Sequence, residues 1–302
     1  WLKKHYPVQF MAAIMNSVMD NSGKVAGYIQ YCRSRAIPVL PPDVNHRGWK
    51  FTVGRVEAGT PGIRFGMGAV KNVGYGAVEA IVQARAGKPF TDFFDFVDRV
   101  PAEAINKRVA ESLIKAGAFD FGQYNRAQLL SVYERAIDDA AQHRKDSLSG
   151  QVSLFDMMGG LNRPAHAAVP DMPEHSRKAL LNMEKEMTGV YICGHPLDEV
   201  AELLRTGFTS VLDVQAMAEN ENHGLDHDGD AVTMAGILTL AKGRITKKGA
   251  MMGIITLEDL TGQIEGLVFP KVYDRFVNLL MADNLVVLTG KLQPYVSGKD
   301  VI

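Results

Sequence analysis

Cysteine is scarce in this chain of 302 residues, which contains only Cys32 and Cys193. Two thiols so far apart form neither a disulfide framework nor a cysteine cluster with metal-binding spacing. Long apolar runs are also missing: no stretch approaches the ~20 apolar residues of a membrane span, and no signal peptide opens the chain. The sequence therefore predicts a protein of the reducing cytoplasm with no membrane partner.

A large excess of one charge is also absent, because 33 Lys and Arg residues nearly balance 34 Asp and Glu residues. The charges are unevenly spread along the chain. Residues 1–145 carry 20 basic against 13 acidic side chains, residues 146–230 carry 5 against 15, and residues 231–302 carry 8 against 6. Basic segments on either side of an acidic middle are candidates for binding a polyanion.

The length and the apolar content of 46% allow two or more domains with cores of their own. Phe10, Ile14 and Val18 repeat every four residues and predict an amphipathic helix, and Asn21 can cap the next one. The chain starts with Trp1 rather than Met, and residues 300–302 read as the start of a strand. We expect a fragment of a longer protein.

Residues 67–85 predict a hairpin that suits a phosphate group. Apolar spacing indicates a short helix on each side of Gly74 and Gly76, and glycine allows the tight turn between them. The first N–H groups of the second helix, together with its positive dipole end, would face a phosphate oxygen, and Lys71 would add charge. The alternative is an ordinary helix turn that uses glycine as a stop.

A second copy of this pattern strengthens the prediction. Lys107 and Arg108, which we also predict to bind the phosphates of DNA, open a helix that ends at Gly117, and another helix follows. Between the copies, Phe90, Phe93, Phe94 and Phe96 form a dense aromatic run. Bases could stack on such rings, but the helical spacing favours packing in the core.

The polar segment after these helices contains the pentapeptide Gln151-Val152-Ser153-Leu154-Phe155. Leu154 and Phe155 are large apolar anchors without an apolar face nearby in the sequence, and Gln151 can both donate and accept a hydrogen bond. This pattern is typical of a peptide that docks into a pocket of another protein. The alternative is that the two anchors fold back onto a neighbouring helix.

In the acidic middle of the chain, His195 and the segment 223–230 could suggest a catalytic or metal-binding site. His195 precedes Pro196 and has no Ser, Cys or paired carboxylate beside it, so we interpret it as structural rather than as a general base. The segment 223–230 contains histidines and aspartates, but it lacks the spacing of a calcium loop. We interpret it as a solvated loop and predict no metal site.

The C-terminal part predicts an OB-fold barrel, because strands 232–240, 254–258 and 264–269 precede a helix at 270–281 and a strand at 285–292. The fifth strand would start at the last residues, which leaves the barrel truncated. The strands show no exposed aromatic side chain, so we expect weak, salt-sensitive and sequence-independent binding of single-stranded nucleic acid. The basic side chains assigned to the first loop are Lys242, Arg244, Lys247 and Lys248.

Several motifs resemble the bacterial replicative DNA polymerase III alpha subunit. They are residues 41–45 (Pro-Pro-Asp-Val-Asn), 66–74 (Gly-Met-Gly-Ala-Val-Lys-Asn-Val-Gly), 106–108 (Asn-Lys-Arg), 113–120 (Leu-Ile-Lys-Ala-Gly-Ala-Phe-Asp) and 194–198 (Gly-His-Pro-Leu-Asp). The resemblance covers essentially the whole chain. It implies a multidomain α+β protein with tandem helix-hairpin-helix motifs and an OB-fold. The implied division is the end of the polymerase fingers (1–60), a helix-hairpin-helix module (61–145), a linker with a clamp-binding peptide (146–172), a helical bridge (173–230) and the truncated OB-fold (231–302).

The resemblance also implies a function, namely that Lys71, Gly74 and Gly76 contact the backbone of duplex DNA and that Gln151, Leu154 and Phe155 dock on the sliding clamp. Other subunits of the replicative holoenzyme are implied as partners. The DNA polymerase activity of the parent protein requires Mg²⁺ held by acidic residues that precede residue 1, so we expect no catalytic residue and no cofactor in this chain. Two alternatives are an error-prone translesion relative of the same family and a stand-alone nucleic-acid-binding protein made of hairpin and OB modules.

Overall fold

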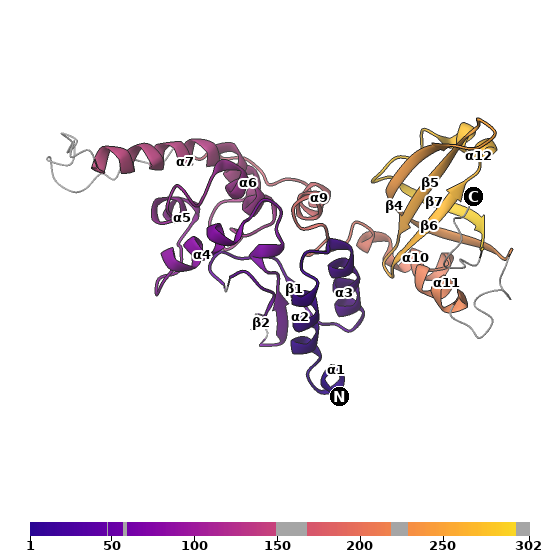
Figure 1. Ribbon diagram of the computed structural model, residues 1–302, viewed down its shortest axis with the longest axis horizontal. Coiled ribbons are helices and arrows are strands. Elements are labelled where there is room, and N and C mark those ends of the chain that lie inside the picture. The colour runs from indigo at the N-terminus through magenta and orange to yellow at the C-terminus, as the bar shows by residue number, and fades with distance from the viewer. Residues whose placement is uncertain (47, 57–58, 149–167, 219–228, 294–302) are drawn as a thin grey trace. The chain divides into compact units, whose positions relative to one another are not determined.

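The computed structural model describes residues 1–46, 48–56, 59–148, 168–218 and 229–293. The chain divides into two compact units, Trp1–Gly194 and His195–Ile302, which are described separately (Figure 1). The division into five segments proposed above is finer than this and stays a prediction. None of the described helices is long and apolar enough to cross a membrane.

Unit 1 begins with helices that pack on a small sheet. The helices are α1 (Leu2–His5), α2 (Pro7–Ser17) and α3 (Ser22–Ser34), and the strands are β1 (Val39–Leu40), β2 (Thr52–Arg55) and β3 (Pro61–Arg64). Asn21 caps α3 as predicted, because its side-chain oxygen accepts a hydrogen bond from the backbone N–H of Lys24 at 3.0 Å. The strand order is β1-β3-β2, with β1 parallel and β2 antiparallel to β3.

The rest of unit 1 is helical. Its elements are the 3₁₀ helix η1 (Met67–Ala69), α4 (Tyr75–Ala84), α5 (Phe93–Arg99), α6 (Lys107–Lys115), α7 (Arg126–Leu148) and α9 (Arg177–Thr188). In Figure 1, α6 lies alongside the start of the long helix α7, and the two are in contact. The helix predicted from Pro173 begins only at Arg177, because Ser176 caps it by accepting a hydrogen bond from the N–H of Ala179.

The aromatic run between the two hairpins lies in the core, which confirms the packing interpretation. Phe93 packs edge-on against Phe119 at 5.1 Å between ring centroids, and Phe96 does so at 4.9 Å. Phe90 meets Phe96 in the same way at 5.2 Å. All of these rings are buried, so no base can stack on them.

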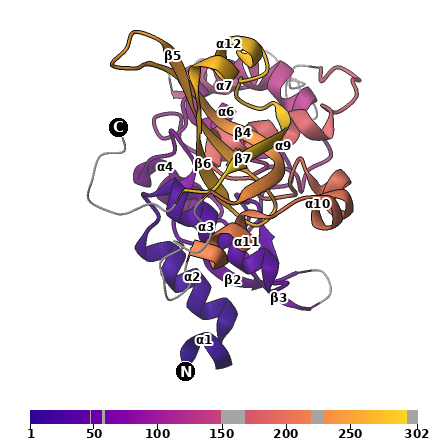
Figure 2. The same ribbon diagram turned by 90° about the vertical axis from the view of Figure 1, so that its right-hand side faces the viewer.

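Unit 2 contains the predicted half-barrel. Helices η2 (Asp198–Val200), α10 (Ala201–Gly207) and α11 (Val211–Ala218) precede strands β4 (Ala231–Ile245), β5 (Met251–Glu258) and β6 (Gln263–Val268), helix α12 (Pro270–Phe276) and strand β7 (Leu285–Lys291). All strand pairs are antiparallel, in the order β6-β5-β4-β7. Helix α12 packs against β5 (Figure 2) and ends earlier than the predicted residue 281. The predicted fifth strand lies outside the described residues.

His195 has a structural environment, as predicted. Its ring is buried; Nε2 lies 3.2 Å from a carboxylate oxygen of Glu258, and Nδ1 accepts a hydrogen bond from the N–H of Leu197. Gln263 donates to the other oxygen of Glu258 at 2.8 Å. Both ring nitrogens have partners inside unit 2, so the histidine fixes the start of this unit against β5.

Candidate nucleic-acid interface

The first hairpin consists of η1, a turn and α4, and differs in detail from the prediction. The expected helix around Ala69 and Val73 is a single 3₁₀ turn over Met67–Ala69, and Gly76 lies inside α4 rather than in the turn. Gly74 is the N-cap residue, with no side chain to cap the helix. Lys71 is exposed beside it, and its backbone N–H is bound to the carbonyl oxygen of Met187 at 2.8 Å.

The start of α4 leaves its backbone donors open. Among the described residues, the N–H groups of Tyr75, Gly76 and Ala77 have no acceptor; the first helical bond joins the N–H of Val78 to the carbonyl of Gly74. A Cβ atom added at Gly74 or Gly76 would meet no other atom within 4 Å. Neither glycine is required by packing within the chain, and together they leave room for an external group to approach the backbone.

In the second hairpin, side chains and backbone groups of the chain itself occupy the space around the turn. Gly117, in the turn after α6, has φ of +84°, and a Cβ there would overlap the guanidinium of Arg126. That guanidinium forms a two-pronged contact with the carboxylate of Asp120, at 3.0 and 2.6 Å. The backbone N–H groups of Gly117 and Ala118 bond back to α6. The N–H groups of Gly117 and Ala118 are therefore not available to an external group.

The N-terminus of α7 is also occupied, and the occupant is a carboxylate. Glu174 accepts hydrogen bonds from the backbone N–H groups of Arg126 at 2.9 Å and Ala127 at 3.0 Å. The side chain of Asn125 takes the next donor, the N–H of Gln128, at 2.8 Å. In this hairpin, an internal anion thus lies where a phosphate would bind a free helix N-terminus.

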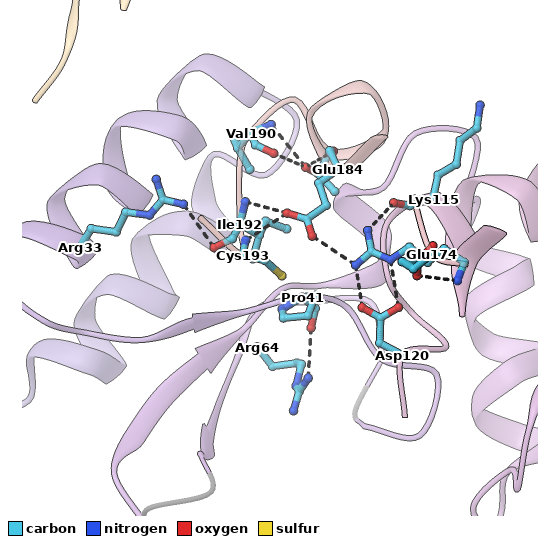
Figure 3. A network of polar contacts seen from close by, with 12 residues as sticks. Arg33, Pro41, Arg64, Lys115, Asp120, Glu174, Glu184, Val190, Ile192 and Cys193 are labelled. Atoms are coloured by element: carbon cyan, nitrogen blue, oxygen red, sulfur yellow. Dashed lines mark hydrogen bonds and ion pairs between the residues drawn. The ribbon is translucent and has the colours of Figure 1, made fainter. Parts of the chain in front are cut away.

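A buried ionic network holds this arrangement in place (Figure 3). Glu184, on α9, is fully buried; it pairs with Arg126 at 3.2 Å and accepts hydrogen bonds from the backbone N–H groups of Ile192 and Cys193. Burial disfavours the charge on Arg126, but the hydrogen bonds and charge of Asp120, with Glu184, outweigh it and raise the pKa of the guanidinium. A buried cation with two carboxylates stays ionised and fixes α9 to the second hairpin.

The two predicted basic residues of α6 are placed differently from Lys71. The ammonium of Lys107 lies 2.8 Å from Asp138 and 3.6 Å from Glu134, both on α7, and the hydrogen bond to Asp138 raises the pKa of Lys107. Arg108 is exposed on the same helix. The positive charge of Lys107 is therefore partly neutralised inside the module, whereas no ion pair is described for Lys71 or Arg108.

The structure corrects the predicted placement of the basic residues of unit 2. Lys242 and Arg244 do not lie in a loop, because β4 continues to Ile245 and pairs with β5 along its whole end. Lys247 and Lys248 do lie in the tight turn between the two strands. All four side chains are exposed, and their positive charges lie along the β4–β5 hairpin rather than in a loop.

The register shows what lies beside these charges. On β4, Lys242 lies opposite Ile254 of β5, and Arg244 lies opposite Met252 of β5. Ile254 in turn lies opposite Leu267 of β6. These five side chains therefore share one face of the sheet. Beyond the end of β6, the ring of Phe269 is 60% exposed, which corrects the expectation that no aromatic side chain is available for stacking. We call this surface, with Lys242, Arg244, Met252, Ile254, Leu267 and Phe269, the hairpin face.

Comparisons with known proteins match one family model in each unit. A family model described as a helix-hairpin-helix motif matches residues 36–129, and one described as an OB-fold nucleic acid binding domain matches residues 232–301. DNA polymerase III subunit alpha of Vibrio cholerae is 36% identical over 293 residues, that of Mycobacterium tuberculosis 38% over 303 residues and that of Escherichia coli K12 33% over 293 residues. Each alignment covers 97% of this chain and 24% of the relative.

The chain is homologous to part of DNA polymerase III subunit alpha. It spans about a quarter of the length of these relatives, and the matched part contains a helix-hairpin-helix motif and an OB-fold. Both belong to families of nucleic-acid-binding modules.

The remaining predicted sites of this polymerase III homologue are not all described by the structure. Gln151, Leu154 and Phe155 lie outside the described residues, as does most of the segment 223–230. Within the described residues, no three His, Cys, Asp or Glu side chains come together as a metal site would require.

The hydrogen bonds that Glu174 accepts at the start of α7 predict that its carboxylate stabilises the fold. Desolvation disfavours the charge on this carboxylate, but hydrogen bonds from the N–H groups of Arg126, His175 and Ala127 outweigh it, so the pKa of Glu174 lies below the usual value for Glu. We expect Glu174→Gln to lower the free energy of unfolding at pH 7 by about 1 kcal/mol, as for loss of a helix cap. Urea unfolding of the 302-residue chain measures this difference.

The lowered pKa of Glu174 also determines how the difference in unfolding free energy between wild type and Glu174→Gln changes with pH. A carboxyl whose pKa is lower in the folded state stabilises the protein above its ordinary pKa of about 4.3, and this stabilisation is lost as the pH falls through the lowered value. The gap between wild type and Glu174→Gln should therefore close below about pH 4. Glu103→Gln, at an exposed glutamate that accepts no described hydrogen bond from the first residues of α7, is the control. A gap that persists in acid would show that charge at the α7 N-terminus is not the cause.

Proposed function

We propose that this chain holds DNA for a replicative polymerase without taking part in the chemistry. The observation that carries the proposal is the set of open N–H groups at the start of α4, beside the exposed Lys71. Such donors bind one phosphate of a DNA backbone whatever the base sequence. Of the two hairpins, the first is the one that contacts duplex DNA, since Glu174 already occupies the equivalent position in the second.

The hairpin face of unit 2 suits a single strand. Lys242 and Arg244 supply charge for the phosphates, and the apolar side chains beside them, with the exposed ring of Phe269, give bases a surface for stacking. In an OB-fold, the strands that correspond to β5 and β6 and the turn before β5 are the usual binding surface for oligonucleotides. The expected binding is salt-dependent and largely independent of sequence.

The linker completes the proposal, with Gln151, Leu154 and Phe155 as a peptide that docks on the sliding clamp. Support comes from their residue types, their spacing and their position after the helix-hairpin-helix module. A clamp that encircles DNA would hold the polymerase at a high effective concentration near the primer end.

The polymerase reaction itself is proposed only for the longer protein, which would act in the cytoplasm with other holoenzyme subunits. As the family resemblance implies, its Mg²⁺ ions would be held outside this chain, and we assign no step of the reaction to these residues.

Duplex binding is tested best at Gly76. A methyl group there meets nothing in the fold, and alanine stabilises a helix by up to about 1 kcal/mol relative to glycine. We expect Gly76→Ala to keep or raise stability and yet to weaken binding to a short labelled DNA duplex about tenfold, because the methyl group pushes a phosphate away from the N–H groups. Fluorescence anisotropy measures the affinity, and thermal unfolding measures the stability.

The matched control for this variant is Gly27→Ala. Gly27 is an exposed glycine inside α3 with no atom within 4 Å of a Cβ, so it should gain stability without losing DNA binding. Like Gly76→Ala, Lys71→Ala should weaken binding, and it should do so equally for all duplex sequences. It should also reduce the slope of log K against log salt by about 1. A change in sequence preference, or Gly76→Ala binding as well as Gly27→Ala, would contradict the assignment.

Single-strand binding is tested by the double variant Lys247→Ala/Lys248→Ala. Removing two phosphate contacts should lower affinity for a labelled oligothymidylate and reduce the slope of log K against log salt by about 1.4. Lys271→Ala, an exposed lysine on α12, is the control. An unchanged salt slope in the double variant would remove the turn from the proposed interface.

Clamp docking is tested by Leu154→Ala and Phe155→Ala in isothermal titration with a purified bacterial sliding clamp. Each buried anchor should cost about 2 kcal/mol or more of binding free energy, so the double variant should show no measurable binding. Leu161→Ala, in the same linker but outside the pentapeptide, should bind like wild type. Unchanged affinity of the double variant would refute the docking assignment.

A further inference from the structure

The first hairpin carries a largely exposed aromatic side chain, Tyr75. Tyr75 is the first residue of α4 and stands between the two open glycines, and 62% of it is exposed. Among the described residues, its hydroxyl group has no hydrogen-bond partner. A large exposed ring at the position of the open backbone donors is a surface for a partner rather than part of the core.

The ring is nevertheless held in one orientation. Its centroid lies 5.4 Å from that of Trp49, at an interplanar angle of 65°, which is an edge-to-face contact. Trp49 is itself fixed, because a Cβ at Gly68 would overlap its ring and its backbone carbonyl accepts a hydrogen bond from the N–H of Gly68 at 3.0 Å. A ring fixed before binding loses little conformational entropy when a ligand arrives.

The charges around Tyr75 favour an anionic ligand. Lys71 and Lys50 are exposed at neighbouring positions of the hairpin and of the Trp49 segment. Glu79 is exposed one helical turn further along α4, where it lies away from the helix N-terminus by about 6 Å of helix rise. The N-terminal end of α4 therefore combines open N–H donors with an exposed tyrosine, and the exposed Lys71 precedes it by four residues in the same hairpin.

We propose that Tyr75 is a DNA-contact residue of the first hairpin, whose ring packs on a deoxyribose and whose hydroxyl donates to the phosphate next to the one held by the α4 N–H groups. Tyrosine suits this role, because its ring is apolar and its tip is a hydrogen-bond donor, and tyrosine side chains are among those that bind the DNA backbone. The proposal rests on the assignment of this hairpin as the duplex-binding surface. It adds a sequence-independent contact that carries no charge.

The chain provides a natural reporter for this contact. It has two tryptophans, Trp1 and Trp49, so the Trp1→Phe variant leaves Trp49 as the only one. Titration of this variant with a short duplex should change the intensity or wavelength of Trp49 emission, with the same Kd as anisotropy gives. This readout requires no substitution at position 75. Saturated binding without any change in emission would overturn the proposal.

Two variants separate the ring from the hydroxyl group. Tyr75→Ala should weaken duplex binding about three- to tenfold, and Tyr75→Phe should weaken it by a smaller factor, because the ring remains. Neither should alter the salt slope, since no charge is removed, whereas Lys71→Ala should reduce it. Tyr6→Ala is the matched control: Tyr6 is 50% exposed and lies 5.8 Å from the other tryptophan, Trp1.

The outcomes distinguish this proposal from the function on which it rests. Duplex binding that is lost in Gly76→Ala and Lys71→Ala but is equal in Tyr75→Ala and Tyr6→Ala would overturn the role of Tyr75 and leave the hairpin assignment intact. A wild-type chain that does not bind duplex DNA would overturn both. A lower affinity of Tyr75→Ala, with an unchanged salt slope and unchanged thermal unfolding, supports the proposal.

Discussion

A backbone N–H group at the start of a helix needs an acceptor, and the two hairpins of unit 1 meet this requirement in opposite ways. At α7, Glu174 supplies a carboxylate from a segment 47 and 48 residues further along the chain. At α4, the described chain supplies no acceptor for Tyr75, Gly76 and Ala77. A duplicated motif can therefore keep one copy for stability and one for binding, according to whether its own chain provides the anion.

The carboxylate at α7 also fixes the path of the chain around the linker. Helix α7 ends at Leu148, and the segment that follows the linker contacts the first residues of the same helix, where Gln128 donates to the carbonyl of Pro170 and Asn125 donates to that of Met172. A helix of 23 residues is about 35 Å long. The segment after the linker is thus held against the helix before it, and we propose that a clamp bound at Gln151, Leu154 and Phe155 would be tethered near the helix-hairpin-helix module.

Local patterns predicted those parts of the structure that depend on neighbours in sequence. Apolar spacing predicted the helices and the order of the strands, and the paired glycines located the first hairpin. The contacts of Arg126 with Glu174 and Glu184 escaped prediction because they join residues 48 and 58 positions apart and because none of the three belongs to a recognisable motif. Lys242 and Arg244 were misplaced because the predicted strand ended at residue 240, whereas pairing with β5 continues to Ile245. Gly243 lies in this strand, and the hydroxyl of Tyr273 packs where a side chain would be.

Glycine shows why composition alone cannot locate a binding surface. Gly117 has a positive φ, and the guanidinium of Arg126 fills the space beside it, so the fold itself requires glycine at that position. Gly76 lies in a regular helix with open space around it, where alanine would be more stable, so the fold gives no reason for its presence. Gly27 in α3 has the same open space, so this feature alone does not indicate a partner; Gly76 differs because it lies among backbone N–H groups that have no acceptor in the described chain. At the start of α4, where open N–H groups lie beside Lys71 and a fixed tyrosine ring, we propose that this partner is the sugar–phosphate backbone of DNA.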